Sequence, residues 1–260
     1  MKKNKEYEFY ESVNNWDFSS IKRIEENLTD WDMYDVIGRV VTKDSKILDL
    51  GTGGGEKVLK HFSDVKEVLG TDYSGAMIET AQKNLKKSGR KNITFRVMDN
   101  LSMDTPEDYF DVVVARHTVI DPVQIYNTLK PGGTLVVRGV DRLDCWELKR
   151  MFGRGQGYRD VKSISQIDYE AILDAGFSDV ELVPIHVREY YASSEDLLKL
   201  LYKTPILVDF SEEELNENKN NRHSIIESDL LDNFIRAHHT KKGILLIRRY
   251  YGITARKKNY

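Results

Sequence analysis

Asp49-Leu50-Gly51-Thr52-Gly53-Gly54-Gly55 is the stretch of sequence that decides the fold. It begins inside a short apolar run at residues 47–50, which is typical of a buried strand, and a helical pattern follows it to about Phe62. Glycines let the backbone turn sharply and approach a ligand without a side chain in the way. Because α/β folds bind nucleotide-type ligands at such a strand-to-helix loop, we predict a fold and a ligand site of that kind.

Strand-like and helix-like segments alternate outward from this loop. Such alternation predicts a parallel sheet with helices on both of its faces. The run at residues 110–115 is apolar without a break, as a central parallel strand should be. We therefore predict an α/β protein, a three-layer α/β/α sandwich with a seven-stranded, mostly parallel sheet. The predicted strands are residues 47–50, 65–71, 93–97, 110–115, 134–140, 180–188 and 244–255.

The segments outside this alternation predict additions to a single domain that spans residues 1–260. Residues 1–43 are polar with spaced aromatics, and we interpret them as a helical lid. Residues 191–240 are too long for a plain loop, so we predict helices there, inserted between the sixth and seventh strands and capping a substrate pocket. The ligand-binding core is then residues 44–190, and residues 241–260 form the last strand and a basic tail.

Composition limits the possible partners and compartments. The net charge of −3 and the pI of about 6.1 give no bulk attraction for nucleic acid. Cys145 is the single cysteine, so it forms neither an intrachain disulfide nor a cysteine zinc cage, and we predict no metal site and a reducing compartment. No signal peptide is visible and no apolar run approaches about 18 residues, so we predict a cytoplasmic protein without membrane contact.

Polar residues that follow the second and third strands extend the candidate ligand site. Asp72 lies 21 residues after the first glycine of the loop, where an acid either accepts hydrogen bonds from a ribose diol or simply caps the next element. Asp99-Asn100 follows the third strand, where the pair either contacts the edge of an adenine or forms an ordinary turn. The dinucleotide pattern Gly-x-Gly-x-x-Gly fails, because Glu56 and Val58 stand where its third glycine would be.

Together these motifs resemble the class I, Rossmann-like family of S-adenosylmethionine-dependent methyltransferases. Asp49-x-Gly51-x-Gly53-x-Gly55 resembles the family's motif I, and Asp72-Tyr73-Ser74-x-x-Met77-Ile78 is similar to the segment after its second strand. Phe110-Asp111-Val112-Val113 and Leu129-Lys130-Pro131-Gly132-Gly133 are similar to its fourth and fifth strand signatures. The resemblance spans about residues 45–140 in the family's order, and it implies S-adenosylmethionine as cofactor and a last strand antiparallel to the others.

The resemblance also implies a role for each matching position. The glycine loop would pass under the methionine part of the cofactor, and Asp72 would hold its ribose hydroxyls. Tyr73 or Met77 would pack on the adenine, and the Asp99-Asn100 pair would reach the adenine edge. The implied cofactor contacts are Asp49, Gly51, Thr52, Gly53, Gly55, Asp72, Tyr73, Met77, Asp99, Asn100 and Arg116.

Arg116 and His117 are the candidate catalytic residues, because they follow the fourth strand at the carboxyl edge of the sheet. Methyl transfer from a sulfonium requires mainly that the acceptor be aligned and water excluded. His117 is then a general base or a group that orients the acceptor, and the alternative is a histidine bonded to nearby backbone. The sequence Ala115-Arg116-His117-Thr118 differs from the Asn-Pro-Pro-Tyr type motif of family members that methylate exocyclic amines of nucleic acid or glutamine.

Spaced aromatic side chains are the candidate contacts for the acceptor. They come from the predicted lid and from the end of the sixth strand, and the alternative is that they only pin these segments to the core. The predicted substrate-binding residues are Trp16, Phe18, Trp31, Tyr34 and Tyr191.

Three functions are consistent with this sequence. The first is methyl transfer to an oxygen or nitrogen atom of a small-molecule acceptor. The second is methylation of an RNA base, which rests on the eight basic and no acidic residues at positions 233–260. The third is binding of S-adenosylmethionine without catalysis, as in a regulator.

Overall fold

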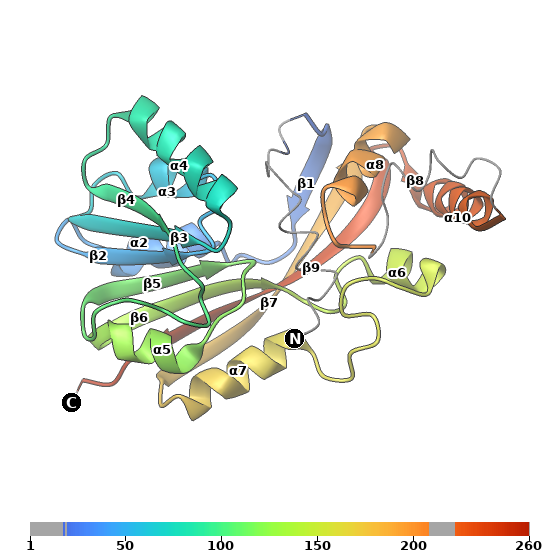
Figure 1. Cartoon of the computed structure of the whole chain (residues 1–260). Helices are drawn as coiled ribbons and strands as arrows, with labels where there is room; N and C mark the ends of the chain where they lie inside the picture. The colour runs from blue at the N-terminus through green and yellow to red at the C-terminus, as the bar shows by residue number, and fades with distance from the viewer. Residues whose placement is uncertain (1–17, 19, 208–221, 260) are drawn as a thin grey trace. The chain divides into compact units, whose positions relative to one another are not determined.

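The computed structural model describes residues 18, 20–207 and 222–259, and side chains in the last of these stretches from residue 228 onward (Figure 1). Its strands follow the hydrogen-bonded order β1-β7-β9-β6-β5-β2-β3-β4, and β8 also pairs with β9. Contacts divide the chain into two compact units. Unit 1 comprises Met1–Thr29, Asp141–Ser163 and Ile185–Arg249, and unit 2 comprises Asp30–Val140, Ile164–Pro184 and Tyr250–Tyr260.

Unit 2 contains the parallel part of the sheet. Its strands pair in parallel from β4 to β6, and β9 lies antiparallel to β6. In this register Leu48 is paired with Leu69 on one side and with Val113 on the other. The strands are β2 (Lys46–Leu50), β3 (Glu67–Asp72), β4 (Ile93–Val97), β5 (Phe110–Arg116) and β6 (Leu129–Val140), together with the first half of β7 (Ser178–Tyr191) and the second half of β9 (Gly243–Arg256).

Alternate residues of these strands enter two separate cores, because successive side chains of a strand point to opposite faces. Ile47 and Val114 belong to one apolar cluster, whereas Leu48 and Ala115 belong to the other. Helices α2 (Met33–Val40), α3 (Glu56–His61) and α4 (Gly75–Ser88) contribute to the first cluster, and we call that side of the sheet the α2 face. Helices α5 (Pro122–Thr128) and α7 (Ile164–Asp174) contribute to the second cluster (Figure 1).

Short polar side chains fix where several of these helices begin. The Asp32 carboxylate accepts hydrogen bonds from the backbone N–H groups of Tyr34 and Asp35, and it thereby caps α2. Ser74 caps α4 in the same way by accepting from the Met77 N–H. Such caps satisfy backbone donors that a helix cannot satisfy itself. They place Tyr34 and the start of α4 at defined positions on the α2 face.

Unit 1 is a separate core built from segments far apart in the sequence. Its buried cluster joins residues of α6 (Trp146–Phe152), α8 (Ser194–Tyr202) and α10 (Arg222–His238) to the strands. Strand β1 (Arg23–Asn27) pairs antiparallel with β7, and the short strand β8 (His239–Thr240) pairs with β9.

A buried ion network lies within unit 1. The Arg248 guanidinium donates to the Asp144 carboxylate, with Nε–Oδ1 at 3.0 Å, and to the Glu189 carboxylate, with Nη1–Oε2 at 3.2 Å. The Tyr191 hydroxyl donates to the same Glu189 carboxylate. Each of these four side chains is at least nine-tenths buried, so the charges depend on one another for compensation.

The predicted fold class is confirmed, with two differences in detail. The sheet has nine strands in the described chain, because β1 and β8 add to the seven that the sequence predicts. The prediction of a helical lid over residues 1–43 is wrong for residues 23–27, which form β1 and not a helix. Helices α8 and α10 lie in the predicted helical insertion of residues 191–240. Within the described stretches, every helix is too short or too polar to cross a membrane.

Candidate functional site

The glycine loop joins β2 to α3 in unit 2. Gly51, Gly53 and Gly55 adopt φ values of +71°, +56° and +77°, a region that side-chain-bearing residues rarely enter. The Thr52 N–H donates to the Thr71 carbonyl at 2.8 Å, which ties the loop to β3. A Cβ atom built on Gly53 would meet no described atom within 4 Å, so a ligand can approach the backbone there.

Asp72 lies beside this open position, at the end of β3. Its Oδ2 accepts the Gly53 N–H at 2.9 Å and its Oδ1 accepts the Ser74 N–H at 2.9 Å. Burial raises the pKa of Asp72, and the two backbone N–H groups lower it in part. Each carboxylate oxygen has a second lone pair, so the carboxylate can still accept two hydroxyl hydrogens. This geometry fits the vicinal hydroxyls of a ribose.

Asp49 is the second acid of the loop and lies on the α2 face of β2. Burial raises its pKa to about 7, while the nearby Thr52 hydroxyl and Arg116 guanidinium lower it and the Asp72 charge raises it. The Thr52 hydroxyl makes no hydrogen bond of good geometry within the described chain, so it offsets little of the desolvation. Asp49 therefore changes its charge close to neutral pH.

Affinity for S-adenosylmethionine is expected to rise about tenfold between pH 6 and pH 8, because the ionised fraction of Asp49 rises about tenfold over that interval and only the carboxylate attracts a cationic ligand. The sign follows from a raised acid pKa, which leaves the neutral form dominant below pH 7. Isothermal titration across this range checks the slope, and Asp49→Asn should flatten it. A flat wild-type profile would place the cationic end of the ligand away from Asp49.

The Asp99-Asn100 pair divides into two different roles. The Asn100 amide donates to the Thr118 hydroxyl at 2.9 Å and to the Val119 carbonyl at 3.2 Å, so it holds the segment that follows β5. Its Oδ1 is buried without a hydrogen-bond partner in the described chain. Asp99 is exposed, and its Oδ1 accepts the Leu101 N–H. Contact with an adenine edge stays a prediction, and the Asp99 carboxylate and the Asn100 carbonyl oxygen are the groups left for it.

The residues beside the loop differ in how accessible they are to a ligand. Tyr73 is 49% exposed and Met77 is 3% exposed, so Tyr73 is the more accessible of the two residues predicted to pack on an adenine. A Cβ atom on Gly51 would lie 2.7 Å from Cβ of Thr118, which shows that the segment after β5 packs against the loop. Arg116 and His117 thus lie next to the predicted cofactor position.

His117 is held in an unusual conformation by β6 and β9. Its φ of +54° is uncommon for a residue with a side chain, and its N–H donates to the Arg138 carbonyl at 2.8 Å. Its ring stacks on Tyr250, with centroids 5.4 Å apart and planes 9° apart, and its Nε2 contacts the Arg138 guanidinium. Because a guanidinium only donates, Nε2 is the acceptor in this contact. A role for His117 as a general base stays a prediction, and it would need Nε2 to leave Arg138.

Two of the predicted acceptor contacts lie on the α2 face of unit 2. Tyr34 stacks on His61 with ring centroids 3.8 Å apart. Burial raises the pKa of Tyr34 to about 12, and the charges of Arg116 and Asp49 also act on it. The Trp31 ring lies over the backbone of Gly252 in β9, 2.6 Å from where a Cβ would be.

The other predicted acceptor contacts lie elsewhere. Tyr191 is fully buried in unit 1 and donates to Glu189, so its hydroxyl serves the ion network. Phe18 packs against the buried cluster of unit 1, with the Lys203 ammonium 5.9 Å from its ring centroid. Trp16 lies outside the described residues. Acceptor binding by these three stays a prediction.

Arg138, Tyr250 and Lys57 are site residues that the sequence analysis missed. Arg138 is paired with Arg116 in the register of β5 and β6, and its guanidinium carbon lies 3.9 Å from the Tyr250 ring centroid. The Lys57 ammonium lies 6.0 Å from the Tyr34 ring centroid. A signal for Arg138 was present, since it is the one charged residue in the predicted strand at 134–140.

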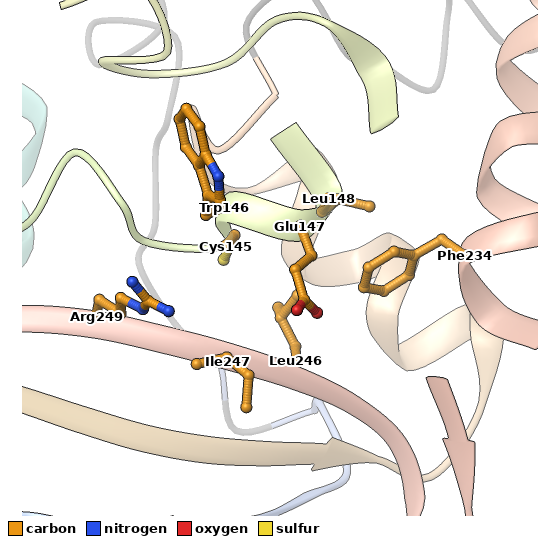
Figure 2. A pocket seen from close by; sticks show the side chains of 8 residues that line it. All are labelled: Cys145, Trp146, Glu147, Leu148, Phe234, Leu246, Ile247 and Arg249. Atoms are coloured by element: carbon orange, nitrogen blue, oxygen red, sulfur yellow. The ribbon is translucent and has the colours of Figure 1, made fainter. Parts of the chain in front are cut away.

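Unit 1 holds a small hollow between α6, α10 and β9 (Figure 2). Its volume of about 20 Å³ is room for about one water, too little for an acceptor molecule. Its walls include Trp146, Glu147, Phe234 and Arg249. The described residues contain no cluster of side chains suited to hold a metal ion.

Comparisons with known proteins bear on the family and the fold. Residues 41–168 match the family model described as a methyltransferase domain. The uncharacterized methyltransferase YcgJ of Bacillus subtilis is 31% identical over 72 residues, which cover 28% of this chain and 28% of that protein. The crystal structure of YcgJ has a TM-score of 0.56 and 18% identity, with 87% of this chain and 97% of that chain covered. At 18% identity, this structural similarity shows a shared fold and nothing further about function.

Two more relatives carry named acceptors. Malonyl-[acyl-carrier protein] O-methyltransferase of Paenibacillus is 29% identical over 174 residues, covering 59% of this chain and 63% of that protein. Phosphoethanolamine N-methyltransferase 2 of Haemonchus contortus, in complex with S-adenosyl-L-methionine, has a TM-score of 0.52 and 18% identity, covering 87% of this chain and 52% of that chain. The chain spans only 28 to 45% of the length of three curated relatives that it matches. The family resemblance that the motifs predict is confirmed.

Proposed function

We propose that this chain, whose residues 41–168 match the family model described as a methyltransferase domain, is a class I S-adenosylmethionine-dependent methyltransferase and transfers a methyl group to an oxygen or nitrogen atom of a small-molecule acceptor. The observation that carries the proposal is the pairing of the open Gly53 position with the Asp72 carboxylate. A nucleoside ligand fits both, because the backbone leaves space and the carboxylate keeps free lone pairs. The orphaned Oδ1 of Asn100 offers a further acceptor at the same edge of the sheet.

The bound cofactor supplies a methyl group already activated by the positive sulfonium. The chain then has to hold the acceptor in line and exclude water. We assign the first task to Arg116, His117 and Arg138, and the support for this is that they lie at the carboxyl ends of β5 and β6. Tyr34 and Trp31 wall the same region with apolar surface.

Methylation of an RNA base remains the alternative function. The basic segment on which it rests is partly engaged in ion pairs within the chain. Of the eight basic residues at positions 233–260, Lys242 pairs with Glu26, Arg248 with Asp144 and Glu189, and Lys257 with Asp108. Paired charges attract phosphate less. An RNA-binding role would show as affinity that falls steeply with salt, and weak salt dependence would argue for the small-molecule acceptor.

Asp72→Ala is expected to weaken S-adenosylhomocysteine binding by about tenfold or more, because two hydrogen bonds to the ribose hydroxyls are lost. Isothermal titration measures the change. Asp44→Ala is the matched control, since Asp44 is an exposed acid that precedes β2 at the opposite edge of the sheet. Equal affinities for wild type and Asp72→Ala would mean that the ribose does not lie at Asp72.

The experiment that tests the proposal is titration with S-adenosylhomocysteine, with NAD as a control ligand. Micromolar binding of the first alone supports a methyltransferase site, and a tritiated methyl donor then identifies acceptors from fractionated small metabolites. Tight binding with no transfer to any metabolite or RNA fraction would favour the non-catalytic reading. Failure to bind would contradict the proposal.

A further inference from the structure

The glycine loop is not equally open along its length. A Cβ atom on Gly53 would meet no described atom within 4 Å, whereas one on Gly55 would lie 2.6 Å from Cζ of Phe95. A Cβ atom on Gly54 would lie 2.5 Å from Oε1 of Glu56. The Phe95 ring belongs to the apolar cluster of the α2 face, but the Glu56 side chain is exposed. The residue that follows the open position is therefore covered by a carboxylate.

The Asn84 side chain of α4 holds this carboxylate in place. Its amide donates to the Gly54 carbonyl at 2.9 Å and to Oε1 of Glu56 at 3.3 Å. An amide nitrogen carries two hydrogens, so one side chain serves both acceptors. Glu56 is also the acid in the first turn of α3, where a negative charge is favourable. Two separate interactions thus keep the carboxylate beside the loop.

Glu56 occupies the position at which a dinucleotide-binding loop has its third glycine. In such a loop the second glycine, here Gly53, lets a pyrophosphate approach the backbone. The Cα atoms of consecutive residues are about 3.8 Å apart, so the Glu56 carboxylate lies within about 8 Å of the Gly53 Cα atom. Like charges at this separation still repel each other at physiological salt, where the screening length is also about 8 Å. A phosphate at Gly53 would therefore be disfavoured.

A sulfonium nucleoside does not meet this repulsion. S-adenosylmethionine carries a net positive charge at neutral pH, and a nearby carboxylate attracts a cation. The nucleoside end of the ligand cannot make the distinction, because the Asp72 carboxylate can accept the hydroxyls of any ribose. The distinction has to be made where the rest of the ligand passes Gly53, and Glu56 lies there.

We propose that Glu56 is a specificity-determining residue that excludes phosphate-bearing nucleotides from the cofactor site. This inference rests on the proposed methyltransferase function and names the class of ligand that the same site rejects. The competing role for Glu56 is that of a first-turn acid that only stabilises α3. The two roles differ in one measurable quantity, which is the ratio of the affinities for a nucleoside and for its diphosphate.

The test is displacement of S-adenosylhomocysteine from the full chain by adenosine and by adenosine diphosphate, in separate isothermal titrations at constant ionic strength without divalent metal. The two probes share the adenine and the ribose and differ in the diphosphate. In wild type, adenosine is expected to displace at the lower concentration. Glu56→Gln keeps the shape of the side chain and an oxygen acceptor for Asn84, and it should tighten the diphosphate by about fivefold while adenosine stays within about twofold.

A second variant and a control accompany Glu56→Gln. Glu56→Gly completes the pattern Gly-x-Gly-x-x-Gly from Gly51 and uncovers Gly54, so it should tighten the diphosphate at least as much. Glu79→Gln is the matched control, because Glu79 is an exposed acid of α4 with no hydrogen bond or ion pair to the loop among the described contacts. Each glutamine variant loses one negative charge and keeps every other charge of the chain, so the difference between them reports the Glu56 carboxylate alone.

The outcomes separate the two roles of Glu56. If neither Glu56 variant binds the diphosphate better than wild type does, the inference is wrong and the acid serves only α3. A wild type that binds both probes equally, or a Glu79→Gln protein that gains as much as Glu56→Gln, also rejects the inference. Affinity for S-adenosylhomocysteine is measured first, so its absence in wild type contradicts the methyltransferase proposal, whereas intact affinity with unchanged discrimination rejects only the role of Glu56.

Discussion

Gly53→Val is expected to abolish S-adenosylhomocysteine binding. The valine side chain would occupy the open space over the loop, the place where the backbone lets a ligand approach Asp72. It would also force a β-branched residue to a φ of +56°, where such residues are outliers. We expect a loss of more than about a hundredfold in affinity by isothermal titration, because steric exclusion leaves no alternative pose.

The control variant Gly89→Val separates the filling of the ligand space from the backbone cost of valine at a positive φ. Gly89 ends α4 with a φ of +68°, and a Cβ there also meets no described atom within 4 Å. The two variants share the backbone cost, of about 1–2 kcal/mol, but only one of them fills the proposed ligand space. If Gly89→Val loses the ligand to the same extent, or Gly53→Val keeps it within tenfold, our assignment of the loop as the cofactor cradle is wrong.

Arg248→Met is expected to lower the free energy of unfolding of unit 1 by about 3–5 kcal/mol, because the buried Asp144 carboxylate would lose its guanidinium partner and the Glu189 carboxylate would keep only the more distant Arg23, at 3.8 Å. Methionine keeps much of the volume of arginine, so the change tests charge more than packing. Urea denaturation followed by fluorescence measures it, and Trp146 in α6 reports on unit 1.

The control for this prediction is Arg236→Met. Arg236 is exposed on α10 and bonds only its neighbour Asn233 among the described contacts, so its loss should change stability by less than about 0.5 kcal/mol. Replacing the three charged members of the network, Arg248, Asp144 and Glu189, by apolar residues of similar size should recover part of the stability. An Arg248→Met protein that unfolds at the wild-type urea concentration would show that water already compensates these charges.

The strands of unit 2 could be predicted because burial on both faces makes them apolar. The predicted strand at residues 93–97 coincides with β4, and the predicted run at 110–115 lies within β5. Strand β1 was missed for the opposite reason. Its sequence, Arg-Ile-Glu-Glu-Asn, is charged and largely exposed, and it is a strand because β7 offers a partner far away in the sequence. The hydrophobic pattern within a short stretch of sequence carries no information about a partner strand that is distant in the chain.

The candidate site also contains some residues that could be predicted from the sequence and others that could not. The loop and Asp72 were predictable, since a short glycine-rich turn and the end of the next strand meet by local geometry. The Arg138–His117–Tyr250 group was not, because it forms through the register of β5, β6 and β9. Tyr191 was misleading for a related reason. An aromatic residue at a strand end looks accessible in sequence, but its hydroxyl serves the buried Glu189.

The antiparallel pairing of β9 with β6 has a consequence for biosynthesis. Thr134 of β6 is paired with Arg256 and Val140 with Tyr250, so β6 lacks this neighbour until residue 256 has emerged from the ribosome. Until then the nascent chain presents an unpaired edge of apolar residues, which invites association with other chains. We therefore expect the sheet of unit 2 to be completed only late in translation. A chaperone that shields the edge of β6 would be of most use before β9 has emerged.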